Sequence, residues 1–378
     1  MTASRLFRSF WLAGFESACH INRRGQRLDL VSATQHDREL EADYARVRDL
    51  GFGGVRESVR WHLVDPDTGS ALDFSTVTPL LEAARRQQVQ VLWTLCHYGW
   101  PEDVELLSPQ FVERFARYCG ALARVVGEQS EGPPFYTPMN EISFFAWAAG
   151  EVGYMFPFLR GRGAELKRHL VRAAVAGMEA ILAVDPRARF IHVDPLIHVV
   201  PPAGRPELAE AAAAQRVSQF DGFDMIAGRL HPELGGRAEF LDIVGVNFYH
   251  ANQWEYPDQR LRWEDTPRDP RWVPLHRLLR EVYERYRRPM IISETSHFGE
   301  GRARWLREVA DEVATARAIG VPLEGLCIYP IIDRPDWDEP ARWHNSGMWD
   351  LCRSADGRLE RVPCEDYVVE LRAAQARV

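Results

Sequence analysis

The chain has 378 residues, of which 46% are hydrophobic and 26% are charged, and its net charge at pH 7 is −8. This composition is typical of a globular protein with a full apolar core. The negative charge argues against a nucleic-acid or anionic-membrane partner, because such partners are bound by clustered Lys and Arg. No stretch approaches the roughly 20 apolar residues that a membrane span requires.

The start of the chain and its cysteines favour a cytoplasmic location. The apolar stretch Phe10–Phe15 is followed at once by Glu16 and soon by His20, so it is too short for a signal-peptide core. The six cysteines are scattered without a CxxC pair. Cys96 and Cys327 lie inside apolar runs, where a reduced, buried thiol is expected.

Short apolar runs that predict β-strands recur along the whole chain. Most of them are nearly continuous in apolar residues, which is typical of strands buried on both faces of a parallel sheet. The eight runs are Phe10–Phe15, Gly53–Val59, Val89–Leu95, Phe135–Met139, Arg189–Val193, Leu241–Phe248, Met290–Ser293 and Leu323–Ile328.

The segments between these runs predict helices. Apolar residues recur at helical spacing in Leu40–Leu50, Phe111–Val126, Leu166–Val184 and Arg304–Ile319. The third of these segments is followed by an Asp-Pro pair and the fourth by Gly-Val-Pro, both of which favour the end of a helix.

Eight strands that alternate with helices indicate either a closed barrel or a large doubly wound sheet. A dinucleotide-binding sheet would have a Gly-rich turn after its first strand, and none is present there. We therefore predict an α/β fold, a single (β/α)8 TIM barrel that forms one catalytic domain over residues 1–378. The segment Trp254–Trp272 is interpreted as a long βα-loop, on the side where barrel active sites form.

Polar side chains follow the predicted strands, where the active sites of barrels lie. They include two acids, two amides, a cation, an imidazole and two phenols, and crowding ionisable groups in this way is costly without a function. These residues are Arg56, His97, Asn140, Glu141, Asn247, Tyr249, Glu294 and Tyr329.

Two of these residues, Glu141 and Glu294, predict a catalytic pair. They follow the fourth and seventh strands, and would face each other across the barrel mouth. Glycoside hydrolysis needs one acid to protonate the leaving oxygen and a second carboxylate to attack the anomeric carbon. Repulsion between the two acids and the charge of Arg56 would separate their pKa values. Asn140 is placed to bond the sugar 2-hydroxyl.

Six motifs in the same order resemble those of glycoside hydrolase family 1, among the clan A retaining β-glycosidases, of which this chain would be a short divergent member. The resemblance covers nearly the whole chain. The family motifs are, in chain order, Y-R-F-S-I-S-W, T-L-x-H-W-D-L-P, T-x-N-E-P, I-N-Y-Y, I-T-E-N-G and G-Y-x-x-W-S-L-x-D-N-F-E-W. The corresponding segments are Val55–Trp61, Thr94–Pro101, Thr137–Glu141, Val246–Tyr249, Ile292–Thr295 and Gly325–Trp337.

The resemblance assigns roles to residues of this chain. It implies that Glu141 is the acid/base, that Glu294 is the nucleophile, that Arg56 contacts the nucleophile and that Tyr249 positions it. The remaining substrate-binding candidates are matched more loosely: Tyr329 at the sugar platform, Asp336 and Trp337 at the sugar-binding acid–Trp pair, and Glu16 and His20 in the region of an early Gln.

The sequence also departs from the family motifs. Ile142 replaces the Pro after the acid, Thr295-Ser296 replaces Asn-Gly after the nucleophile, and Tyr329 replaces a Trp. The expected activity is that of a retaining exo-β-glycosidase, β-glucosidase-like or β-galactosidase-like, that needs no cofactor or metal and takes a small carbohydrate or glycoside. The identity of the sugar, the aglycone and the oligomeric state are not indicated.

Three other functions stay open at this point. A transglycosylase would use an acceptor in place of water on the same scaffold. A metal-dependent barrel hydrolase would need ligands such as His192, Asp194 and His198. Their spacing lacks a helical HxxxH or HExxH pattern, which favours a core or loop role for these residues over a metal site. A barrel without catalytic activity would bind carbohydrate alone.

Overall fold

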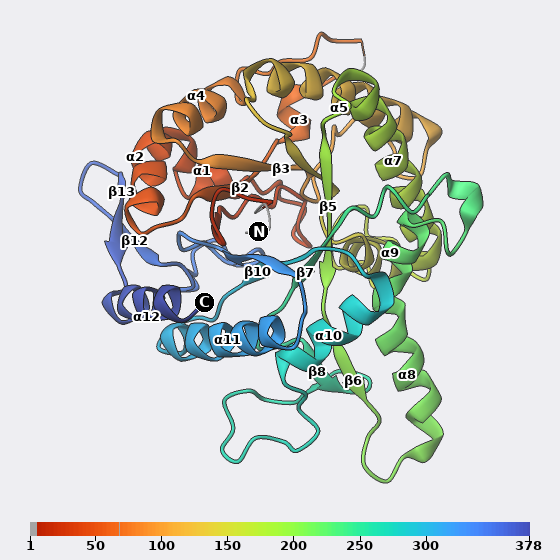
Figure 1. Cartoon of the computed structure of the whole chain (residues 1–378). Helices are drawn as coiled ribbons and strands as arrows, with labels where there is room; N and C mark the ends of the chain where they lie inside the picture. The colour runs from red at the N-terminus through yellow and green to blue at the C-terminus, as the bar shows by residue number, and fades with distance from the viewer. Residues whose placement is uncertain (1–5, 68) are drawn as a thin grey trace.

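The predicted strands close into a barrel in a computed structural model that describes residues 6–67 and 69–378 (Figure 1). Residues 1–5 and 68 of the expected 1–378 domain lie outside the described residues. The expectation about a signal peptide at the start of the chain therefore falls partly outside them. Each barrel strand pairs in parallel with both neighbours, and the cyclic order is β1-β2-β3-β4-β5-β7-β10-β11. The strands are β1 (Trp11–Gly14), β2 (Gly54–Ser58), β3 (Gln90–Cys96), β4 (Phe135–Met139), β5 (Arg189–Pro195), β7 (Ile243–Asn247), β10 (Met290–Thr295) and β11 (Leu323–Ile328).

Helices surround the barrel as an outer layer (Figure 1). The longer ones are α2 (His36–Asp49), α4 (Thr78–Gln87), α5 (Pro109–Gln129), α7 (Gly163–Val184), α10 (Leu275–Tyr286), α11 (Gly301–Ala318) and α12 (Glu365–Arg377). Shorter ones are α1 (Leu30–Ala33), α3 (Trp61–Val64), α6 (Ile142–Phe145), α8 (Ala209–Val217) and α9 (Asp221–Ile226). The (β/α)8 barrel predicted from the sequence is confirmed.

Local sequence signals explain where the helices begin and end. Ser108 accepts a hydrogen bond from the backbone N–H of Phe111 and so caps α5, whose first residue is Pro109. Helix α7 ends at Val184, immediately before the Asp-Pro pair that predicted its end. No helix in the described part of the chain is both long and apolar enough to cross a membrane.

One predicted loop contains short strands instead. The segment Trp254–Trp272 was interpreted as a loop, but β8 (Gln253–Glu255) and β9 (Gln259–Arg260) pair in antiparallel fashion there. Strand β6 (His198–Val200) adds to β8 in parallel. A two-stranded sheet, β12 (Trp349–Arg353) with β13 (Leu359–Pro363), was also not predicted. Strands β6, β8 and β9, with three, three and two residues, fall below the length at which sequence periodicity is informative.

Two apolar layers hold the barrel. One lies between strands and helices, and the other fills the barrel interior with side chains that alternate along the strands. On β1, for example, Leu12 belongs to the inner cluster, whereas Trp11 and Ala13 pack toward the helices. The inner cluster consists of Phe7, Leu12, Leu92, Phe135, Ile191, Val193, Ile243, Ile291, Cys327 and Tyr329. The polar side chains at the carboxyl ends of the strands lie above this packed interior.

Candidate active site

Strand alternation brings Arg56 to the inner face of the barrel. A Cβ on Gly54 would lie 2.7 Å from a methyl carbon of Leu12, so position 54 faces the interior, and so does Arg56 two residues later. The Arg56 guanidinium donates to Glu294 and to the side-chain oxygen of Asn140. Glu57 points the opposite way, toward the helices, and accepts from the Tyr44 hydroxyl. Arg56 therefore pairs with Glu294 and not with its sequence neighbour.

A break in strand register directs Glu294 at Arg56. The pairing of β10 with β7 shifts between Ile292 and Glu294, and bulges of this kind re-aim side chains beside active sites. The second Glu294 oxygen accepts from the Tyr249 hydroxyl at 2.8 Å. Burial raises the pKa of Glu294, while the Arg56 charge and the hydrogen bonds from Arg56 and Tyr249 lower it. These donors favour the ionised carboxylate.

Glu141 occupies a strained backbone position with a different set of partners. Its φ is 44°, in the left-handed region that costs a non-glycine residue on the order of 1–3 kcal/mol and that is concentrated at functional sites. One carboxyl oxygen accepts from Asn247 Nδ2 at 2.8 Å and the other from the Tyr98 hydroxyl. Burial, followed by the negative charge of Glu294, raises the pKa of Glu141 to about 8.

Hydrogen bonds join the two acids into one network. Arg56 bonds both Glu294 and Asn140, and Asn140 donates from Nδ2 to the Tyr98 hydroxyl at 2.9 Å, which in turn donates to Glu141. Glu294 is paired with a guanidinium, whereas the donors to Glu141 are neutral. A single proton shared between these repelling carboxyls is therefore favoured on Glu141.

His97 and Tyr329 lie on the same side of the barrel with Glu16. The hydroxyl of Tyr329 donates to Glu16 Oε1 at 3.1 Å, and the Tyr329 ring packs under Arg56, 5.4 Å from its guanidinium carbon. His97 Nδ1 lies 3.0 Å from the Ser17 hydroxyl. Burial lowers the pKa of His97 well below its usual value, so the imidazole is neutral.

His20 and Trp337 form a second group near Tyr98. The His20 ring lies 4.7 Å from the Trp337 ring and 6.2 Å from that of Tyr98, edge to face. Both His20 nitrogens and the Trp337 indole nitrogen are buried without a hydrogen-bond partner in the described structure. Asp336 differs, since its carboxyl accepts from the backbone N–H groups of Asp338 and Glu339 and lies 3.0 Å from His344 Nε2. Both carboxyl oxygens of Asp336 are thus engaged by groups of its own loop.

Comparison with known proteins places this geometry on a known scaffold. No protein-family model matches the chain, and no curated protein matches it. A β-glucosidase from Thermotoga maritima in complex with glucoimidazole is similar, with TM-score 0.80 and 15% identity over 98% of this chain and 99% of that one. A family 1 β-glucosidase from the same organism in complex with isofagomine lactam has TM-score 0.78 and 14% identity over 100% and 99% of the chains. The AHE enzyme from Alicyclobacillus herbarius has TM-score 0.76 and 17% identity over 91% and 88%.

The chain shares the fold of these β-glucosidases.

Three residues of the site were not predicted as functional. Tyr98 bonds both Glu141 and Asn140, Ser17 contacts His97, and Arg334 forms an ion pair with Glu16 at 3.0 Å. Tyr98 lies directly after His97 at the end of β3, which was a usable signal. Its φ of 66°, which turns the chain there, is not readable from the sequence.

His192, Asp194 and His198, for which the sequence favours a core or loop role over a metal site, do not form a cluster of metal ligands among the described residues. His192 Nε2 lies 3.0 Å from the carbonyl oxygen of Phe240. Asp194 accepts from the N–H and the hydroxyl of Ser143 at 2.9 and 2.8 Å. His198 has left the barrel strand for β6. The sequence spacing therefore does not bring these three residues to one point, and a metal-dependent hydrolase built on them is not supported.

Proposed function

We propose that the chain, as a single catalytic domain, is a retaining exo-β-glycosidase that hydrolyses a terminal β-linked sugar. The supporting observation is the asymmetry of the buried acid pair. Glu294 is bonded by a guanidinium and a phenol, and Glu141 has its pKa raised to about 8. Double displacement needs this difference, because one carboxyl must be protonated while the other is ionised.

Each partner then has a part in the reaction. In the first step Glu141 donates its proton to the glycosidic oxygen, and Glu294 attacks the anomeric carbon to form a covalent ester as the aglycone leaves. In the second step Glu141, now ionised, takes a proton from water, which displaces Glu294 with a second inversion. Tyr249 and Arg56 orient the nucleophile throughout, and Asn140 and Asn247 hold the network around the acid.

The substrate class is inferred from the comparisons and from the groups around the acids. The Thermotoga β-glucosidases bind the sugar-like inhibitors glucoimidazole and isofagomine lactam. His20, His97, Tyr329 and Trp337 are the groups we propose to contact the sugar, whereas Asp336 and Glu16 act by holding the loops that carry them. A small carbohydrate or glycoside is therefore the proposed partner.

The decisive experiment is a screen of aryl β-glycosides of glucose, galactose, fucose, mannose and glucuronic acid, followed by NMR of the first-formed product. We expect turnover of at least one substrate with a β-configured product. An α-configured first product would indicate inversion and would contradict the proposed role of Glu294. Added alcohol acceptors separate hydrolysis from transglycosylation, since only the latter accumulates a new glycoside as its main product.

The pH dependence of kcat/KM should reflect the two carboxyls. Activity requires a protonated Glu141, so it should fall as the pH rises through about 8, the pKa to which burial and Glu294 raise this group. It also requires an ionised Glu294, so it should fall on the acidic side, at a pH above the ordinary range of Glu because burial raises that pKa too. A profile that still rises above pH 9 would exclude Glu141 as the acid.

Tyr98→Phe should move the alkaline limb of that profile. The Tyr98 hydroxyl bonds the Glu141 carboxyl and favours its charged form, so its removal should raise the pKa of Glu141 and shift the limb to higher pH. Tyr154→Phe is the matched control, because that half-buried phenol donates to Asp338 at 3.0 Å and not to the acid pair. A limb that stays in place or moves to lower pH in Tyr98→Phe contradicts this contact.

A further inference from the structure

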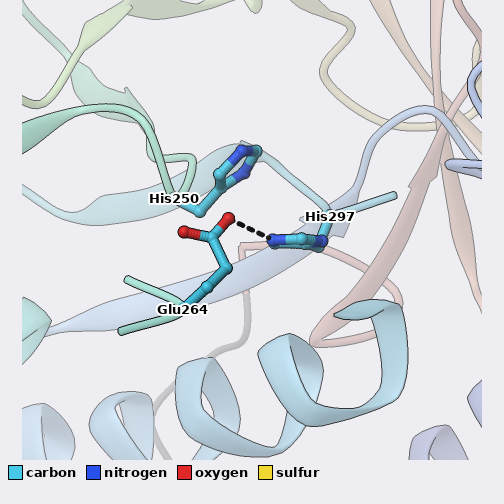
Figure 2. Close-up of side chains that lie close together, drawn as sticks. All are labelled: His250, Glu264 and His297. Atoms are coloured by element: carbon cyan, nitrogen blue, oxygen red, sulfur yellow. Dashed lines mark hydrogen bonds and ion pairs between the residues drawn. The ribbon is translucent and has the colours of Figure 1, made fainter. Parts of the chain in front are cut away.

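A group of three potential metal ligands lies in the segments that follow β7, β9 and β10, outside the hydrogen-bond network of the acid pair. His250 comes three residues after β7, His297 two residues after β10, and Glu264 from the segment that follows β9. One ligand atom of each lies within 4.8 Å of those of the other two. Figure 2 shows the Glu264 carboxylate directed at His297, to which it is bonded, with His250 beside them.

The geometry of one pair already fits a metal. His297 Nε2 lies 3.3 Å from Glu264 Oε1. Zinc bonds of roughly 2.0–2.2 Å to nitrogen and oxygen place two tetrahedral ligands about 3.3 Å apart. His297 Nδ1 lies 2.9 Å from the carbonyl oxygen and 2.8 Å from the backbone nitrogen of Phe298, and a metal at Nε2 selects the tautomer in which Nδ1–H donates to that carbonyl. Gly301 permits this placement, because a Cβ there would lie 2.3 Å from Nδ1.

The second histidine has no other use in the described structure. His250 is only 6% exposed, yet neither of its ring nitrogens has a hydrogen-bond partner. Leaving a polar group buried and unpaired costs about 1–3 kcal/mol, so such a group calls for an explanation. Its ring centroid lies 4.1 Å from that of His297, and one of its ring nitrogens lies within 4.8 Å of the ligand atoms of His297 and Glu264. A ligand between the two rings would satisfy it.

The surroundings favour a single bound cation. The rings of Trp263 and Phe298 lie 5.1 and 4.9 Å from that of His297, which excludes water on that side and strengthens coordination. The Glu264 side chain is 36% exposed, which leaves an entry path and room for a water ligand. The charge of Arg260 opposes a cation here, but this residue is on the exposed strand β9, where solvent screens it.

We propose that His250, Glu264 and His297 form a binding site for one zinc ion, with water as the fourth ligand. Two imidazoles and one carboxylate are a set that zinc prefers and that Mg²⁺ and Ca²⁺ do not. The ion ties the segment that carries Glu264 to the ends of β7 and β10. It thereby steadies Tyr249 and Glu294, which precede the two histidines by one and three residues. This proposal does not rest on the proposed glycosidase activity, because zinc binding is measured directly.

The test is zinc binding to the full chain, first stripped of metal by chelation. Calorimetric titration with ZnCl₂ should give one ion per chain, and zinc should raise the melting temperature. Glu264→Gln, on a partly exposed side chain that leaves the fold intact, should weaken binding at least about 10-fold, and so should His250→Gln. A tenfold excess of MgCl₂ should not compete.

Two controls separate this site from other zinc ligands. Glu312→Gln removes a carboxylate that lies 2.7 Å from His276 Nδ1 on a neighbouring helix, and Cys352→Ser removes the exposed thiol. Both should bind zinc as the unmodified chain does. The proposal is overturned by absent binding, by binding that Glu264→Gln and His250→Gln leave unchanged, or by binding that depends on Cys352.

Discussion

Glu294→Gln should abolish turnover while leaving the fold in place. The amide keeps the size of the side chain and its oxygen can still accept from Arg56, but its NH2 group cannot accept from Tyr249 and the amide cannot form the covalent ester with the sugar. Removing a covalent nucleophile costs roughly 10⁴-fold or more in kcat. The measurement is kcat on the best aryl β-glycoside from the screen, with circular dichroism to confirm the fold. Activity within 10-fold of the unmodified chain would exclude Glu294 as the nucleophile.

A matched control and a rescue experiment make this result specific. Asp194→Asn replaces another buried carboxyl, on β5, whose pKa burial raises to about 7 and which bonds Ser143 and not Arg56. The kcat of this variant should fall less than about 10-fold, because Asp194 touches neither the reacting atoms nor the nucleophile. In Glu294→Gly, azide should occupy the vacated space, attack the anomeric carbon from the same face and yield an α-glycosyl azide. A β-glycosyl azide from this variant would contradict attack from the Glu294 side.

The barrel was predictable from the sequence because its signals are long and repeated. All eight apolar runs became barrel strands, and the four amphipathic segments lie on helices α2, α5, α7 and α11. Burial on both faces removes the polar alternation and leaves a pattern that few other folds produce. The short strands β8 and β9 have no such signal. Among the described residues, strand β9 pairs only with β8, and β8 also pairs with β6, more than 50 residues earlier in the chain, a contact that a local pattern does not contain.

The candidate site was predictable to the level of residue type and strand end. Arg56, Asn140, Asn247 and Tyr249 all lie within one hydrogen-bond network with the two acids, as their positions after strands suggested. What the sequence did not reveal is the aim of each side chain, which depends on the register shift before Glu294 and the positive φ of Glu141 and Tyr98. Both features are properties of the assembled backbone.

The histidines illustrate the same limit. The pattern His192, Asp194 and His198 drew attention because the three are close in sequence, yet strand β5 ends between the second and the third. His250, Glu264 and His297 span 48 positions and meet only because β7 and β10 are neighbours in the barrel. The sequence favoured a core or loop role for the first three residues, and the adjacency that brings the second three together is one of strands and not of sequence.

Glu141→Ala should separate substrates by their leaving groups. An aglycone that departs as a stable anion, such as dinitrophenolate, needs little protonation, so its release to form the Glu294 ester should stay within about 10-fold of normal. For a substrate with a poor leaving group, such as an alkyl alcohol, kcat/KM should fall by the full contribution of a general acid, about 10²–10⁴-fold. Stopped-flow measurement of dinitrophenolate release compared with steady-state hydrolysis of an alkyl glycoside gives both numbers.

The second step adds an independent requirement, because the same side chain acts there as the base. With dinitrophenyl substrates the ester should accumulate in Glu141→Ala, and azide, which needs no base, should release it as a β-glycosyl azide. The alkaline fall in kcat/KM near pH 8 should disappear, since the group that titrates there is gone. Glu151→Ala, on an exposed acid ten residues further along the chain, is the control and should change neither limb nor substrate preference. Equal losses of activity on substrates with good and poor leaving groups would exclude Glu141 as the acid. An unchanged alkaline limb of the kcat/KM profile would show that another residue titrates there.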